Sequence, residues 1–129
     1  MFDTVWYDNL IKPELNPPEW IFTPVWIILY LTILIALILY AIKITDKNKL
    51  SGYVTFITHM IFNLLWSPVF FILHKMGIAL FIIIFMDFSA IILIKSFCKI
   101  SKLAGSILIP YLTWILFATY LNYRLVVLN

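Results

Sequence analysis

Residues 78–86 read Ile-Ala-Leu-Phe-Ile-Ile-Ile-Phe-Met, an unbroken run of apolar side chains. A membrane-spanning β-strand would alternate apolar and polar residues over about ten positions, and this stretch does not alternate. Within a bilayer the backbone must satisfy its own N–H and C=O groups, which leaves helices and closed barrels. The stretch therefore predicts a helix that lies in a membrane.

The chain carries four apolar blocks of this kind, at residues 20–42, 53–73, 77–94 and 103–128. Each is close to the roughly 20 residues that cross a hydrocarbon core of about 30 Å. The hydrophobic fraction is 64%, well above the level of soluble domains, which is about 45–50%. We predict an all-α integral membrane protein with four transmembrane helices. A single membrane domain over residues 1–129 would hold a Pro/Trp-rich loop (1–19) and helices at about 20–43, 53–73, 77–97 and 103–127.

The charged residues predict the orientation of the bundle. Six lysines fall in the two loops that share one side of a four-helix bundle: Lys43, Lys47, Lys49, Lys95, Lys99 and Lys102. Basic loops favour the cytoplasmic side, so we expect both termini to face outward from the cell membrane. Lysines at membrane edges do not predict nucleic-acid binding. A single cysteine, Cys98, excludes a cysteine metal cluster, and no metal site is predicted.

Polar and aromatic residues recur at helical spacing on two of the predicted helices. His59, Asn63 and Trp66 follow i, i+4, i+7 spacing and share one face. Trp114 and Ala118 share a face of the last helix. In lipid such faces turn inward, where polar side chains join helices. Aromatic residues at helical spacing more often serve helix packing than ligand binding, and the spacing alone leaves both interpretations open.

Asp87 falls near the midpoint of its helix, where an unpaired carboxylate costs roughly 2.5–3.5 kcal/mol. It should be protonated or face a partner, for which Thr113 and His59 lie at similar depth. Two interpretations remain open: a neutral, hydrogen-bonded acid, or a proton site formed by Asp87 and His59. No nucleophile–base pair or phosphate loop accompanies them, so no catalytic residue is predicted on chemical grounds.

Three blocks resemble one known family. The first is Trp6-Tyr7-x2-Leu10-x-Lys12-Pro13-x3-Pro17-Pro18-x-Trp20-x-Phe22-x-Pro24-Val25-Trp26-x3-Tyr30. The second is Asn63-x2-Trp66-x-Pro68-x-Phe70-Phe71, and the third is Pro110-Tyr111-x2-Trp114-x2-Phe117-Ala118-x2-Leu121-Asn122-Tyr123. They are similar to the TspO/MBR family, the tryptophan-rich sensory proteins that include the translocator proteins. Family members have five transmembrane helices, so the resemblance implies that this chain corresponds to helices two to five. His59 stands where a glutamine is common in the family.

The resemblance implies a binding site for protoporphyrin IX and similar hydrophobic ligands, with a sensory, regulatory or transport role and no obligatory cofactor. The matching positions are Asn16, Phe22, Thr23, Trp26, Tyr30, Asn63, Trp66, Trp114, Ala118 and Leu121, the first three at the mouth of the site. Some bacterial relatives support light-dependent porphyrin breakdown, in which tryptophans matching Trp26 and Trp114 are implicated. Flat apolar rings on indole and phenol faces, fixed by a few polar groups, are the usual make-up of such sites.

Two other functions stay open at this level. Four short helices and a buried acid also fit a small proton-coupled multidrug-type exporter that uses Asp87. A structural membrane subunit without a ligand is the remaining interpretation. Separately, a chain without a cavity-lining helix is expected to form a homodimer, or to take the missing helix from a neighbouring protein, since either would cover the inner surface.

Overall fold

The computed structural model describes residues 10–12 and 19–129, and of residues 19, 20, 22 and 23 it describes the backbone alone. The described chain is helical: α2 (Glu19–Ile42), α3 (Leu50–Ser67), the π-helical turn η1 (Pro68–Ile72), α4 (Met76–Ile100), α5 (Lys102–Ser106) and α6 (Ile109–Leu128). Four helical segments are long and apolar enough to cross a bilayer: Pro24–Ile42, Leu50–Ile72, Met76–Ile100 and Lys102–Leu128. The prediction of an all-α protein with four spanning helices is confirmed.

Two of the four spans are not continuous α-helices. Pro68 lacks an N–H, so it cannot continue the α-helical hydrogen bonding of α3. The chain instead widens into η1, where the Leu73 N–H donates to the Pro68 carbonyl at 3.0 Å. Similarly, Pro110 stands in the first turn of α6, a position that needs no N–H donor. The expected helix at 103–127 is therefore divided at Ile107 and Leu108 into α5 and α6.

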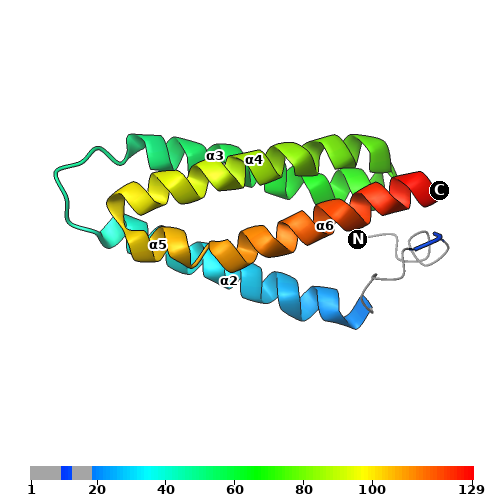
Figure 1. Ribbon diagram of the computed structural model, residues 1–129, viewed down its shortest axis with the longest axis horizontal. Helices are drawn as coiled ribbons and strands as arrows, with labels where there is room; N and C mark the ends of the chain where they lie inside the picture. The colour runs from blue at the N-terminus through cyan, green and yellow to red at the C-terminus, as the bar shows by residue number, and fades with distance from the viewer. Residues whose placement is uncertain (1–9, 13–18) are drawn as a thin grey trace.

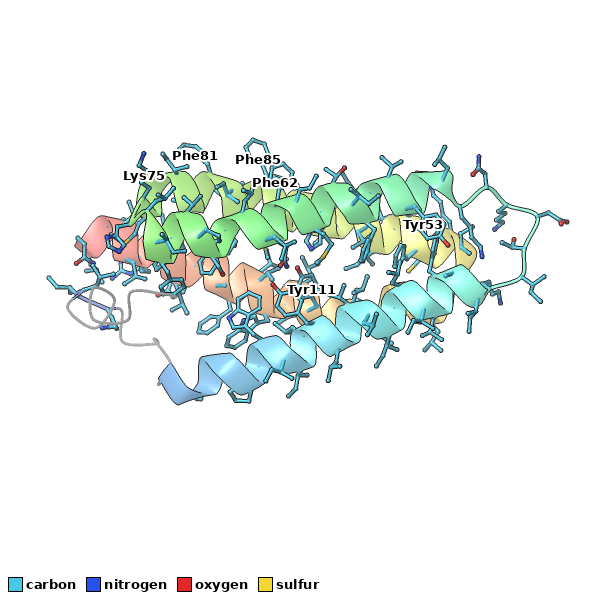
Figure 2. The ribbon with its side chains drawn as sticks, turned by 180° about the vertical axis from the view of Figure 1, so that it is seen from behind. Tyr53, Phe62, Lys75, Phe81, Phe85 and Tyr111 are labelled. Carbon is cyan, nitrogen blue, oxygen red and sulfur yellow. The ribbon has the colours of Figure 1, made fainter. Side chains whose placement is uncertain are left out.

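The long helix α4 lies at the centre of the fold, against α3, α5 and α6. Figure 1 shows α3 and α4 running side by side, with α2 along the opposite face of the bundle beside α5 and α6. The inward face of α4 is fully buried at Ala79, Ile83, Leu93 and Phe97. Its outward face exposes large apolar groups such as Phe81 and Phe85, which point away from the bundle in Figure 2. That outer surface suits contact with lipid chains.

The two lysine-rich loops lie together at one end of the bundle, and the start of α2 and the end of α6 lie at the other (Figure 1). At the loop end the α2–α3 connection is held by side chains. The Tyr40 hydroxyl donates to the Lys49 carbonyl at 2.8 Å. The Lys49 ammonium donates to the carbonyls of Ala41 and Lys43, at 2.9 and 2.6 Å, and so occupies acceptors that the end of α2 leaves open.

At the opposite end the last residue is tied to the segment before α2. The Asn129 side chain accepts from the Ile11 N–H at 3.1 Å and donates to the Ile11 carbonyl at 2.9 Å. This two-way amide pair fixes residues 10–12 beside the C-terminal end of α6.

Candidate functional site

A chain of hydrogen bonds crosses the interior of the bundle and joins four helices. The Tyr30 hydroxyl on α2 donates to the Asn63 side-chain oxygen on α3 at 2.7 Å. The Asn63 side-chain nitrogen donates to the Tyr111 hydroxyl on α6 at 2.6 Å. Tyr111 in turn lies 2.6 Å from Nε2 of His59, whose Nδ1 lies 2.7 Å from the Ser89 hydroxyl on α4. Figure 2 labels Tyr111, whose side chain extends from α6 toward the space between the helices.

The direction of every bond in this chain follows from counting protons. The Ser89 hydroxyl has one proton and lies 2.8 Å from the Met86 carbonyl, which can only accept. Ser89 therefore accepts from His59, whose Nδ1 carries the proton. Nε2 of the neutral ring is then an acceptor, so Tyr111 donates to His59. In this direction every hydroxyl proton has an acceptor, whereas the reverse direction would leave the Tyr30 hydroxyl proton without one.

The members of this chain lie deep in the bundle. His59 is fully buried, Tyr111 is 1% exposed and Asn63 is 4% exposed, whereas Tyr30 at the α2 end is 39% exposed. A buried polar network that satisfies all its members is rigid and defines one arrangement of the helices. This chain of hydrogen bonds therefore runs from Tyr30, a partly exposed residue of α2, to a neutral imidazole in the core.

Three aromatic side chains lie together at the Tyr30 end of this chain of hydrogen bonds. They are Trp26, Tyr30 and Trp66, and we call them the Trp26–Tyr30–Trp66 cluster. The Trp26 ring lies 6.0 Å from the Tyr30 ring and 6.4 Å from the Trp66 ring, centroid to centroid, with tilted planes. Both distances fall within the range of favourable aromatic pairs. Trp66 is fixed further by its indole N–H, which donates to the Asn122 side chain at 2.9 Å. The indole face, and not its polar edge, is therefore what Trp66 can offer to a ligand.

The residues predicted for the site divide into three groups. The structure brings together Trp26, Tyr30, Asn63 and Trp66 through the contacts above. On α6, Ala118 and Leu121 are buried on the side that also carries Tyr111, and Trp114 is half-buried with its ring 5.5 Å from that of Phe117. Asn16 and the side chains of Phe22 and Thr23 lie outside the described residues, so the predicted mouth is not placed.

Tyr111, Ser89 and Asn122 are the polar partners that sequence reasoning did not assign to the site. Each is a polar side chain within an apolar block, and in lipid that is itself a signal of an inward, functional position. Tyr111 and Asn122 stand in the third family-like block. The sequence did not show which side chains they contact, and so they were not assigned to the site. Asn122 extends the network by donating to the Met76 carbonyl at 3.0 Å, which joins α6 to the start of α4.

Asp87 has a partner other than the expected one. Its carboxyl lies 2.6 Å from the Thr119 hydroxyl on α6, whereas Thr113 donates to the Ile109 carbonyl of its own helix. The expectation of Thr113 was therefore wrong. Asp87 is 7% exposed, and its second oxygen, Oδ1, has no hydrogen bond within the described parts of the chain. No three His, Cys, Asp or Glu side chains of those parts converge as metal ligands do.

The sequence was also compared with known proteins. A sequence model of the TspO/MBR family matches residues 1–128. The chain belongs to the TspO/MBR family. Together with the four apolar spans, this makes it a multi-pass integral membrane protein. The family resemblance seen in the three sequence blocks is thereby confirmed.

Several TspO/MBR relatives align along nearly the whole chain. The tryptophan-rich protein TspO of Archaeoglobus fulgidus is 40% identical over 125 residues, which are 96% of this chain and 80% of the relative. The tryptophan-rich sensory protein of Cereibacter sphaeroides is 36% identical over 124 residues, 96% of this chain and 77% of the relative. The translocator protein of Homo sapiens is 32% identical over 126 residues, 92% of this chain and 71% of the relative.

Proposed function

We propose that this TspO/MBR protein binds a tetrapyrrole of the protoporphyrin IX type within its membrane bundle and serves a sensory or regulatory role. The main observation behind this proposal is the hydrogen bond of 2.7 Å between the Tyr30 hydroxyl and the buried Asn63 amide. The Tyr30 ring lies beside the ring of Trp26, which in turn lies beside the ring of Trp66. Apolar ring faces with a few fixed polar groups are what a flat hydrophobic ligand requires. The name of the Cereibacter sphaeroides relative, a tryptophan-rich sensory protein, supports the sensory role.

The small and apolar residues of α6 support the same assignment. Ala118 is buried and has a side chain small enough to leave room for a ring, and Leu121 continues the apolar wall one turn further on. Trp114 lies one turn before Ala118 on this helix. A macrocycle between α2 and α6 would therefore have indole and phenol faces on one side and an aliphatic wall on the other.

The direct test is a titration of the purified full-length chain with protoporphyrin IX in the dark, followed by quenching of tryptophan fluorescence. Saturable quenching is expected for the wild-type protein. Trp26→Leu removes a ring contact worth about 0.5–1.5 kcal/mol, so affinity should fall about two- to twelvefold. The matched control is Phe85→Leu, which removes an aromatic ring from the exposed outer face of α4 and should leave affinity unchanged.

Two further variants separate the α6 wall from the polar contact of Tyr30. Ala118→Leu adds side-chain volume on the α6 wall and should weaken binding without touching Trp26. Tyr30→Phe removes the hydroxyl and keeps the ring. Linear quenching without saturation in the wild-type protein would overturn the proposed binding and favour the structural-subunit interpretation.

Proton-coupled export is the second candidate function, and the observation that favours it is the buried Asp87 with one oxygen unbonded by described residues. An exporter of this kind must load and release a proton during its cycle. Asp87→Asn would then abolish pH-dependent efflux of a hydrophobic dye from vesicles. Efflux that persists in Asp87→Asn vesicles eliminates this mechanism.

The proposal also includes self-association as a homodimer. The mass of the particle in mild detergent, measured by native electrophoresis, decides between a monomer and a dimer. A monomer that binds protoporphyrin IX with full affinity would remove the dimer from the proposal and leave the ligand site intact.

A further inference from the structure

We propose that Tyr111 and His59 form a proton-coupled electron donor that reduces a light-excited tetrapyrrole bound at the Trp26–Tyr30–Trp66 cluster. The inference rests on the proposed function, because it requires the ligand. Beyond ligand binding, it assigns a photochemical step to Tyr111 on α6 and His59 on α3. The observation on which it depends is the 2.6 Å hydrogen bond between the Tyr111 hydroxyl and His59 Nε2.

A tyrosine in an apolar interior can lose an electron readily only when its phenolic proton has a base to receive it. The oxidised phenol is a strong acid, and a positive radical in a low-dielectric site is costly. Neutral imidazole is such a base, with a usual pKa near neutrality. Because Ser89 fixes the His59 proton on Nδ1, the lone pair of Nε2 faces the Tyr111 hydroxyl. Ser89 is thus a positioning residue for the pair.

The other tyrosines with assigned partners in the described interior lack a base. The Tyr30 hydroxyl donates to an amide oxygen, that of Asn63, and the Tyr40 hydroxyl donates to the Lys49 carbonyl. Amide oxygens do not accept a proton near neutral pH. Tyr111 is therefore distinguished from them by its partner, and Tyr40 provides a matched control.

Tyr111 is also close to the ligand region. Asn63 bridges it to Tyr30 through bonds of 2.6 and 2.7 Å, and Tyr30 is a member of the aromatic cluster. The Asn63 N–H donates to the Tyr111 oxygen and stays in place when the phenolic proton leaves. Electron transfer to a ring stacked at the cluster would cross one intervening side chain.

Light excites the bound tetrapyrrole, which then accepts one electron from Tyr111 and becomes a radical anion. The Tyr111 O–H bond breaks, its proton forms a new N–H bond at His59 Nε2, and a neutral tyrosyl radical remains. The imidazolium keeps its Nδ1–H bond to Ser89 and donates from Nε2 to the tyrosyl oxygen. Since a buried imidazolium is costly, electron and proton return in the dark unless dioxygen takes the electron and forms superoxide.

The experiment is electron paramagnetic resonance on the full-length protein loaded with protoporphyrin IX, frozen in the dark and then illuminated. We expect a light-induced tyrosyl signal in the wild-type protein, narrowed when tyrosines are ring-deuterated. The signal should be lost in Tyr111→Phe and in His59→Gln, which removes the base, and kept in the control Tyr40→Phe. In D₂O its formation should slow severalfold, because a proton moves together with the electron.

Dark titration of the same samples separates the possible failures. Wild-type protein that binds protoporphyrin IX but gives no tyrosyl signal overturns this inference and leaves the proposed function standing. An undiminished signal in Tyr111→Phe or His59→Gln overturns it as well. If the wild-type protein does not bind the porphyrin, both fall together. A wild-type signal that neither narrows on ring deuteration nor forms more slowly in D₂O overturns the inference even where a variant does not fold.

Discussion

The carboxyl of Asp87 and the hydroxyl of Thr119 lie 2.6 Å apart, and the same hydroxyl lies 2.8 Å from the Ile115 carbonyl one turn back in α6. Hydrogen bonds from a threonine hydroxyl to the carbonyl four residues earlier recur in the helices of this protein. They are made by Thr32, Thr55, Thr58 and Thr113. A hydroxyl has one proton, so Thr119 can donate to only one of these two oxygens. If Thr119 follows the other threonines and donates to Ile115, Asp87 must donate to Thr119, so we predict a neutral acid that links α4 to α6.

A neutral Asp87 can be observed directly. The infrared difference spectrum between wild-type protein and Asp87→Asn should contain the carbonyl stretch of a protonated carboxylic acid. If that spectrum instead shows carboxylate bands, the protonation assignment fails.

Thr119→Val tests the same link through stability. It leaves the buried acid of Asp87 without its acceptor, so we expect a loss of about 1–3 kcal/mol in thermal or denaturant unfolding in detergent. The matched control is Thr113→Val, because Thr113 is exposed and makes the same bond within its own helix. Equal effects of the two substitutions would contradict a specific role of the Asp87 contact.

Gly52 leaves room at the start of α3 for the side chain of Tyr40, which comes from the end of α2. A Cβ at this position would overlap the hydroxyl and ring of Tyr40, which itself is 1% exposed. Gly52→Ala should therefore destabilise the protein by about 1–3 kcal/mol through overpacking. Gly77→Ala is the control, because a Cβ there meets no atom within 4 Å. The unfolding temperatures of the two variants, measured side by side, should differ in that order, and Tyr40→Leu should partly rescue Gly52→Ala.

Trp66→Phe separates the polar edge of the indole from its ring. The Asn122 side-chain oxygen loses its donor, and since Asn122 is 1% exposed we expect a loss of about 1–3 kcal/mol in stability. Protoporphyrin IX affinity should change little, because an aromatic face remains at the cluster. Adding Asn122→Leu should cost less than the sum of the single changes. Strict additivity would mean that the two side chains are not coupled.

The orientation predicted from the lysines can be tested by labelling single cysteines in a Cys98→Ala background. Asn48→Cys lies in the exposed α2–α3 loop, and Leu73→Cys is exposed at the opposite end of the bundle, between η1 and α4. In sealed cells an impermeant maleimide should reach Leu73→Cys and not Asn48→Cys. The reversed pattern would place the lysine-rich loops outside.

Much of the fold follows from the sequence because lipid imposes simple rules on the chain. The apolar blocks predict the number and type of the spanning helices, and the spacing of His59, Asn63 and Trp66 predicts a common inward face, on which all three are buried. Such patterns are local, since they depend only on helical geometry and on the cost of exposing polar groups to hydrocarbon.

The partners across helices could not be obtained in this way. Local spacing does not set the axial register of α6 against α4, and the division of the last span at Ile107 and Leu108 changes where α6 begins. This is why Asp87 meets Thr119 instead of Thr113, and why the bond between Tyr111 and His59 was not foreseen. The direction of the hydrogen-bond chain needed distances, since it depends on the Ser89 contact with the Met86 carbonyl.

The bonds that close the loop between α2 and α3 have a consequence for how the chain is made. These hydrogen bonds join residues that are six to nine positions apart along the chain. They can form while the later spans are still on the ribosome. The spans of α2 and α3 can therefore enter the bilayer as a helical hairpin whose loop is already closed by hydrogen bonds. The helices α4 and α6 then pack against this hairpin after they have been synthesised.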